Sequence, residues 1–208
     1  MEIKLTFFKI IILLFVFFKS LLAAGNPQLT YTINSSQSQF LVTTSKAGLL
    51  KFFGHSHTID IRSISGIVNL TSDSIVPASL EMLIYTDSLQ VVDNVDEKER
   101  QQIERTMYNK VLETEKYPEV IFKGSKISVN KTETGKYNIK IEGSLTLHGV
   151  TRSITINALM TLKETTLRAK GSFSLKQKDF GIKRASALGG TVKVGDKILF
   201  SFDIFAER

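Results

Sequence analysis

Residues 137–148 read Tyr-Asn-Ile-Lys-Ile-Glu-Gly-Ser-Leu-Thr-Leu-His, in which apolar residues or glycine alternate with polar residues. The first set consists of Tyr137, Ile139, Ile141, Gly143, Leu145 and Leu147. Successive side chains of an extended strand point to opposite faces, so a period of two indicates a strand with one buried face. The stretch therefore predicts a long β-strand that is buried on one side.

The same alternation recurs along most of the chain. It is clearest at 167–176 and 198–204, and similar segments lie at 29–33, 39–44, 58–64, 66–70, 78–87, 120–129 and 153–162. Turn-forming pairs such as Thr134-Gly135 and Gly189-Gly190 separate several of these segments. The pattern predicts an all-β domain of many strands that are joined by short connections.

One segment departs from this period. From Glu97 to Glu113 apolar residues recur at helical spacing among charged ones, and Asp96 is placed to cap the start of a helix. Closure into a barrel is the simplest way to hide the edges of so many strands. We therefore expect a single antiparallel, eight-stranded, lipocalin-like β-barrel with one helical excursion.

The first 24 residues have the layout of a secretory signal peptide. Lys4 and Lys9 precede an apolar run at 10–18, and small residues follow at 23–25. This order is typical of a cleaved leader. The apolar run is also shorter than the roughly 20 residues of a membrane span, so an uncleaved anchor ranks second.

Cleavage near Ala24 would leave residues 25–208 as one domain, which is large enough to bury a core without disulfides or a structural metal. Cysteine is absent, so neither disulfides nor a lipoprotein anchor are expected. We expect a periplasmic or secreted protein with no stable membrane span after cleavage.

The charge of the chain is mildly basic. The formal +7 of the whole sequence falls to +5 without the leader, which leaves 24 basic and 19 acidic side chains. Lys and Arg are scattered singly and Trp is absent, so nothing indicates a nucleic-acid surface. No cofactor-binding signature is found, and no cofactor is expected.

Several motifs resemble those of the YceI-like family, in the family's order and over nearly the whole mature chain. They are Lys46-Ala-Gly-Leu-Leu running into Gly54-His-Ser-His-Thr-Ile, then Tyr117-Pro-Glu-Val-Ile-Phe-Lys-Gly-Ser, Gly143-Ser-Leu-Thr-Leu-His-Gly-Val-Thr-Arg and Lys178-Asp-Phe-Gly-Ile-Lys. The Gly-His-x-His form suggests the branch that carries this motif. The resemblance implies a lipocalin-like barrel that holds a polyisoprenoid or other long-chain lipid in an apolar tunnel. None of the motifs is a catalytic signature, so we expect a carrier and not an enzyme.

With this resemblance we favour a tunnel over a filled core. The expected wall residues are Ile139, Ile141, Gly143, Leu145, Phe173 and Phe202. Gly143 and Gly171 fall on apolar faces, where a bend of the barrel is the alternative explanation. Three basic residues beside the motifs, Arg152, Lys183 and Arg184, are candidates to hold an anionic headgroup at the mouth, against the alternative of solvated surface.

Two other functions stay open. His55, His57 and His148 would form a catalytic zinc site if their imidazoles converged, although each His is more often a satisfied polar residue. A ligand-free structural or stress-related barrel, acting through its surface, is the third hypothesis. The sequence is compatible with a monomer or a homodimer.

Overall fold

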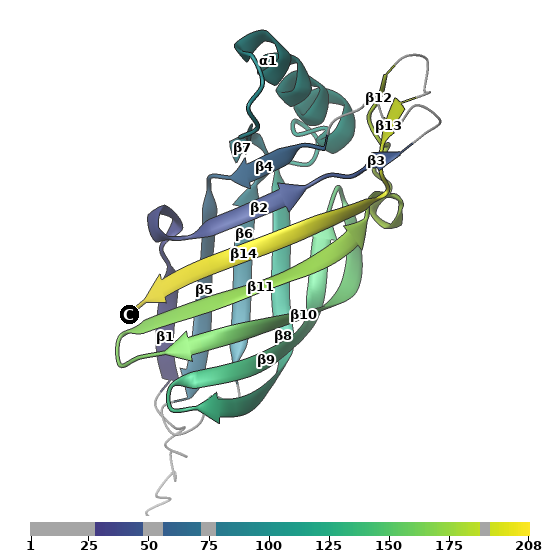
Figure 1. Ribbon diagram of the computed structural model, residues 1–208. Coiled ribbons are helices and arrows are strands. Elements are labelled where there is room, and N and C mark those ends of the chain that lie inside the picture. The colour runs from purple at the N-terminus through teal and green to yellow at the C-terminus, as the bar shows by residue number, and fades with distance from the viewer. Residues whose placement is uncertain (1–27, 48–55, 72–77, 188–191) are drawn as a thin grey trace, which may run out of the picture.

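The computed structural model describes residues 28–47, 56–71, 78–187 and 192–208 (Figure 1). The predicted signal peptide at 1–24 lies outside the described residues, as does His55. None of the helices in these ranges combines the length and apolar character needed to cross a membrane.

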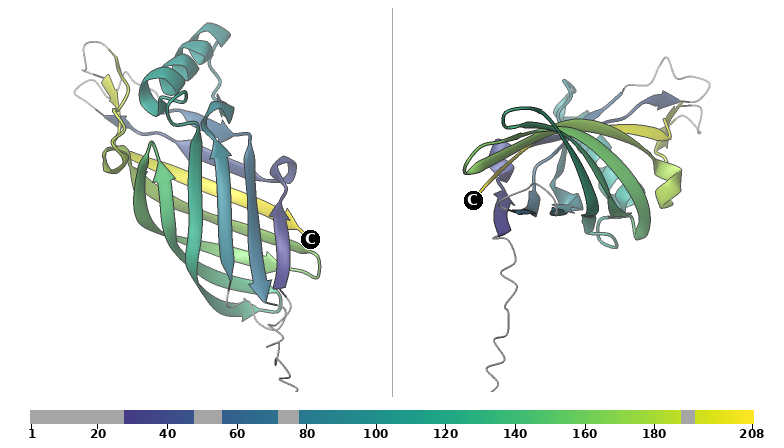
Figure 2. Two further views of the ribbon diagram at one scale, coloured as in Figure 1. Left: turned by 180° about the vertical axis from the view of Figure 1, so that it is seen from behind. Right: turned by 90° about the horizontal axis from the view of Figure 1, so that it is seen from below.

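Eight antiparallel strands form a closed barrel, as predicted. In spatial order they are β1 (Gln28–Ile33), β5 (Ile64–Thr71), β6 (Ser79–Tyr85), β8 (Glu119–Glu133), β9 (Lys136–Leu147), β10 (Val150–Leu162), β11 (Thr166–Lys176) and β14 (Lys197–Glu207). The barrel closes where β14 pairs with β1, at Thr32↔Glu207 and Ile33↔Ala206. Further views show the strands wrapping around a common interior (Figure 2).

Three of the barrel strands continue past a break into β2 (Gln39–Thr43), β4 (Thr58–Ile61) and β7 (Leu89–Val91). The breaks are the 3-10 turns η1 (Ser35–Gln37) and η3 (Thr86–Ser88) and the pair Arg62-Ser63. Ser35 Oγ donates to Arg62 O, and Arg62 N donates to Ser88 O, so the three breaks lie at one level. The sheet therefore bends there and extends the barrel towards the upper end of Figure 1.

The predicted helix is confirmed as α1 (Glu97–Thr106), followed by the π-helical turn η4 (Met107–Leu112). The Asp96 carboxylate accepts a hydrogen bond from Glu99 N and so caps its start. The helix stands over the upper end of the barrel beside β7 (Figure 1).

Side chains of α1 and η4 cover the free edge of β7. Val91 N donates to Glu104 Oε1 at 2.9 Å, Arg100 Nη1 donates to Val91 O, and Tyr108 Oη donates to Leu89 O. Burial of the Tyr108 phenol, and then the nearby Glu104 carboxylate, raise its pKa above the ordinary value. A strand edge that would otherwise be open is thus closed by a helix.

A small second sheet, which the sequence did not predict, lies at the same end. It consists of β12 (Ser186–Ala187), β13 (Val192–Val194) and β3 (Lys46–Ala47).

The side wall of the barrel has one incomplete ladder. β10 pairs with β9 from Val150 to Thr161, but it pairs with β11 only from Ala158↔Gly171 to Leu162↔Leu167. The upper halves of β10 and β11 therefore diverge. A short 3-10 segment, η5 (Gln177–Phe180), lies between their upper ends and accepts a hydrogen bond from Arg152 Nε at Asp179 O.

Candidate functional site

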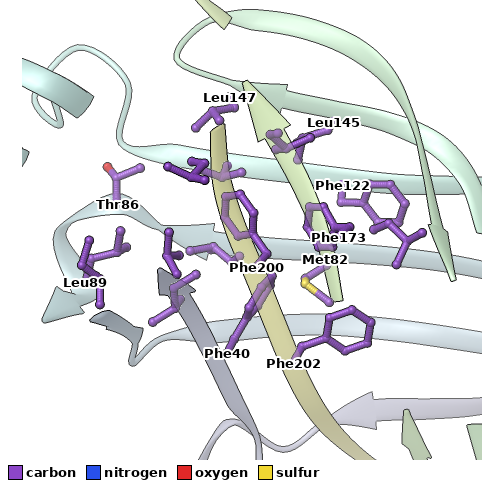
Figure 3. Close-up of a pocket in the computed structure, with 18 of the residues that line it drawn as sticks. Phe40, Met82, Thr86, Leu89, Phe122, Leu145, Leu147, Phe173, Phe200 and Phe202 are labelled. Carbon is purple, nitrogen blue, oxygen red and sulfur yellow. The ribbon is translucent and has the colours of Figure 1, made fainter. Parts of the chain in front are cut away.

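The barrel encloses a cavity of about 560 Å³. Its wall is formed by the inward side chains of the barrel strands and of β2 and β4, and α1 and η4 contribute at the upper end. Figure 3 shows wall side chains of β2, β6, β8, β9, β11 and β14. A close-packed core leaves few voids larger than a water molecule, whereas small-molecule sites span about 300–1,000 Å³. The interior is therefore a ligand-sized cavity and not a filled core.

Phenylalanines form one side of the cavity. Phe173 and Phe200 stack with nearly parallel rings and centroids 4.8 Å apart, and Phe40 meets Phe200 and Phe202 edge-on at 6.1 and 6.0 Å. These geometries are the favourable ones for aromatic pairs. They hold the rings of β2, β11 and β14 in fixed positions around the cavity (Figure 3).

Five of the six predicted wall residues line the cavity: Ile139, Ile141, Leu145, Phe173 and Phe202. Other residues that line it, such as Phe40, Met82, Phe122 and Phe200, were not predicted individually, although all four lie in alternating segments. The same alternation of apolar and polar residues would have placed all four on inward faces. Whether a ligand contacts these side chains stays a prediction.

Gly143 differs from the expectation, because it is not among the described residues that line the cavity. A Cβ at this position would lie 2.3 Å from Lys123 O and 2.8 Å from Gly124 Cα. Gly143 and Gly124 are register partners beside the β-bulge between Gly124 and Lys126. The glycine thus allows two backbones to approach closely at a bend of the barrel. This bend is the alternative explanation given for Gly143 in the sequence.

Two buried polar side chains in the wall are satisfied within the protein. Thr86 Oγ1 donates to Tyr117 O at 2.9 Å, and Gln177 Nε2 donates to Gly195 O at 2.8 Å. Among the described residues, no buried side-chain polar atom lacks a partner. The deep wall therefore offers a ligand apolar contacts and few polar ones.

The three predicted headgroup residues do not line the cavity. Lys183 and Arg184 are exposed, and Arg152 is exposed with its Nε bonded to Asp179 O at 3.0 Å. Arg152 pairs in register with Leu145, so it begins on the inner face of the sheet. It turns towards η5 because β10 and β11 diverge at this height.

His57 and His148 bond to different carboxylates. His57 lines the cavity, and its Nδ1 lies 2.8 Å from Asp93 Oδ2. His148 Nε2 lies 2.9 Å from Glu113 Oε2, and the His148 ring packs on Tyr117 at 4.2 Å between centroids. Within the described ranges, no group of three or more His, Cys, Asp or Glu side chains is placed to hold a metal ion.

His148 and Gly149 form the turn between β9 and β10, with φ angles of 52° and 72°. Positive φ at both central residues is the pattern of a tight two-residue hairpin. A Cβ on Gly149 would lie 2.6 Å from Tyr117 Cε1, so the glycine leaves room for that ring. His148 and Gly149, from the motif that begins at Gly143, thus pack against Tyr117, which begins another motif. This packing gives both motifs a structural role.

Comparison with known proteins identifies the family. The chain matches the model of the YceI-like domain over residues 31–206. It belongs to the YceI-like family. No curated protein matches this YceI-like chain.

Solved structures share the fold of this YceI-like protein. Burkholderia cenocepacia BcnA is 18% identical, with 83% of this chain and 98% of that chain covered at a TM-score of 0.61. A polyisoprenoid binding domain from Saccharophagus degradans, implicated in plant cell wall breakdown, is 14% identical over 85% and 97%, at a TM-score of 0.62. The Campylobacter jejuni YCEI protein is 16% identical over 72% and 84%, at a TM-score of 0.52.

Proposed function

We propose that this protein is an exported, non-catalytic carrier that binds a polyisoprenoid or a similar long-chain lipid inside its barrel. The observation that carries the proposal is the apolar cavity of about 560 Å³. Each methylene group that enters such a cavity contributes about 0.8 kcal/mol, so a long chain binds tightly through apolar contacts alone. The similarity to a polyisoprenoid binding domain supports the same ligand class.

The cavity also argues against a ligand-free barrel that acts only through its surface. Wall side chains beside an empty space lose dispersion contacts that a packed core would give them. Occupation by a lipid restores these contacts.

Export is proposed from the leader at 1–24, and the Gly-His-x-His branch from residues 54–57. N-terminal sequencing of the native protein should begin near Gly25, and the protein should fractionate outside the cytoplasm. An intact Met1 in the membrane fraction would contradict export without affecting the ligand.

Mass spectrometry of an organic extract tests the carrier function directly. Protein purified gently from its native source should release a long-chain isoprenoid or related lipid in near-stoichiometric amount. An unrelated exported protein purified in parallel is the control for adsorbed lipid. A lipid-free extract, together with indifference of thermal stability to added polyprenyl lipid, would reject the proposal.

A further inference from the structure

Polar side chains of the cavity gather at its upper end. They belong to α1, to η3, η5 and β12, and to residues that adjoin β2 and β4: Thr44, His57, Thr86, Glu99, Gln102, Thr106, Gln177 and Ser186. The wall formed by β8, β9 and β11 contributes only apolar side chains to the lining. The cavity thus has an apolar body and one polar end.

Half of these polar groups are already bonded inside the protein. Besides Thr86 and Gln177, Thr44 Oγ1 accepts from His57 N and Thr106 Oγ1 donates to Gln102 O. The side chains of Glu99, Gln102 and Ser186, and the Nε2 atom of His57, differ, because they have no hydrogen-bond partner among the described residues. They are the groups available to a ligand.

His57 is held in one orientation. Its backbone N donates to Thr44 Oγ1 and its O accepts from Thr44 N, both at 2.9 Å. Asp93 Oδ1 accepts from Thr58 N at 2.9 Å, while Asp93 Oδ2 faces His57 Nδ1. A carboxylate that only accepts places the proton of the neutral ring on Nδ1, which leaves Nε2 as an oriented acceptor.

Among the described residues, the lining of this end contains one charged side chain, and it is acidic. Glu99 is the charged residue of the lining, Asp93 lies behind His57, and no Lys or Arg lines the cavity in the part of the chain that the structure describes. An anionic phosphate would meet the Glu99 carboxylate with no cation among the described lining residues, and such like-charge contacts are costly. An uncharged hydroxyl group would instead donate to His57 Nε2.

We propose that His57, oriented by Asp93, binds the hydroxyl headgroup of a long-chain isoprenoid alcohol, and that Glu99 disfavours the corresponding phosphate. This inference rests on the proposed carrier function and adds the headgroup class to it. It replaces Arg152, Lys183 and Arg184 as the expected headgroup residues.

The test compares three ligands that share one chain. Geranylgeraniol, its monophosphate and the hydrocarbon without the oxygen are titrated into delipidated mature protein, and their dissociation constants are measured by calorimetry. We expect the alcohol to bind about three- to tenfold more tightly than the hydrocarbon, the worth of one net hydrogen bond. The monophosphate should bind more weakly than the alcohol.

Variants assign the effect to residues. His57→Phe keeps a ring but removes the acceptor, so the alcohol and the hydrocarbon should bind equally. His148→Phe is the matched control outside the cavity and should keep the wild-type ratio. Glu99→Gln should narrow the gap between the alcohol and the monophosphate. If His57→Phe does not fold, Asp93→Asn, which leaves the His57 tautomer undefined, should reduce the alcohol preference.

The outcomes separate the two proposals. If none of the three ligands binds, the carrier function fails and this inference fails with it. If all bind equally, or the monophosphate binds best, the carrier function stands and the headgroup assignment is overturned. An unchanged alcohol preference in His57→Phe would also overturn it.

Discussion

At the scale of single residues, Gly143 shows how closely two strands approach at the bend of the barrel. The nearest atoms to a Cβ at this position are backbone atoms of β8, which cannot rotate away as a side chain can. The opposing residue, Gly124, is also a glycine. The pair therefore sets the spacing of β8 and β9 beside the bulge.

Gly143→Ala should destabilise the fold. The added methyl group must push β8 and β9 apart, and overpacking of this kind costs about 1–3 kcal/mol. Urea unfolding measures the loss, and Ser144→Ala on the same strand should stay within about 0.5 kcal/mol of wild type. A Gly143→Ala protein as stable as that control would show that the strands separate freely here.

Asp203 joins β14 to β11 through two cations. Its carboxylate receives Arg168 Nε at 2.6 Å and Nη2 at 2.8 Å, and Lys170 Nζ at 2.8 Å. The hydrogen bonds from Arg168 hold the pKa of Asp203 below its ordinary value. A carboxyl group whose pKa is lowered on folding stabilises the protein above the unfolded pKa, and this stability is lost as the pH falls.

Asp203→Asn should therefore cost stability at neutral pH and little in acid. We expect the free energy of unfolding to fall by about 1 kcal/mol or less at pH 7, since the pair is near the surface. The difference in this free energy between wild type and variant should narrow below about pH 4. Urea unfolding of both proteins across this range measures it. Glu164→Gln, at an exposed turn, is the control, and a pH-independent difference for Asp203→Asn would contradict the charge-based account.

At the scale of elements, α1 is attached to the barrel largely through polar side chains. None of its own residues is buried, whereas Met107 of the following turn is. Glu104, Arg100 and Tyr108 bond the backbone of β7 as a neighbouring strand would. The helix thereby closes the sheet edge and the upper end of the cavity together.

Glu104→Ala should release this edge. Val91 N would lose its acceptor, and an unsatisfied buried donor costs about 1–3 kcal/mol. The Val91 amide should exchange with solvent faster, and thermal unfolding should occur at lower temperature. Glu104→Gln keeps an acceptor and should lie close to wild type, as should the exposed Arg105→Ala. Unchanged Val91 exchange in Glu104→Ala would show that the edge is held by other contacts.

The alternating pattern predicted the long strands well, because each residue's face depends only on its own strand. The stretch 137–148 became β9 (Lys136–Leu147), which differs from it by one residue at each end. The break at Arg62-Ser63 and the short strand β7 were missed, since hydrogen bonds between neighbouring strands set them. The same limit applies to the site: its walls followed the alternation, but the His57–Asp93 pair joins residues 36 positions apart with no local signal.

At the scale of the whole molecule, the barrel combines a closed hydrogen-bonded wall with an interior that is not filled. β11 pairs with β14 over its full length, whereas it leaves β10 after Gly171. The cavity is bounded there by side chains such as Ile154, Phe173 and Leu175 instead of a continuous ladder. The molecule therefore keeps internal space at a cost in packing, and this space is the property that a carrier needs.

Ala169→Leu tests this relation between stability and binding. Ala169 lines the cavity from β11, so a larger apolar side chain there should fill part of the empty space. Filling a cavity commonly adds about 0.5–2 kcal/mol, and the lipid-free variant should unfold at a higher temperature than the lipid-free wild type. A saturating lipid at about 100 times its dissociation constant should stabilise the wild type by roughly 2.7 kcal/mol, and the variant by less.

Ser172→Leu adds the same side chain at an exposed position of β11 and should leave the lipid-induced shift unchanged. Thermal unfolding with and without geranylgeraniol gives both quantities for each protein. If Ala169→Leu lowered the stability of the empty protein and kept the full lipid-induced shift, the added side chain would lie outside the space that the lipid occupies, and the lipid would have to bind elsewhere on the barrel.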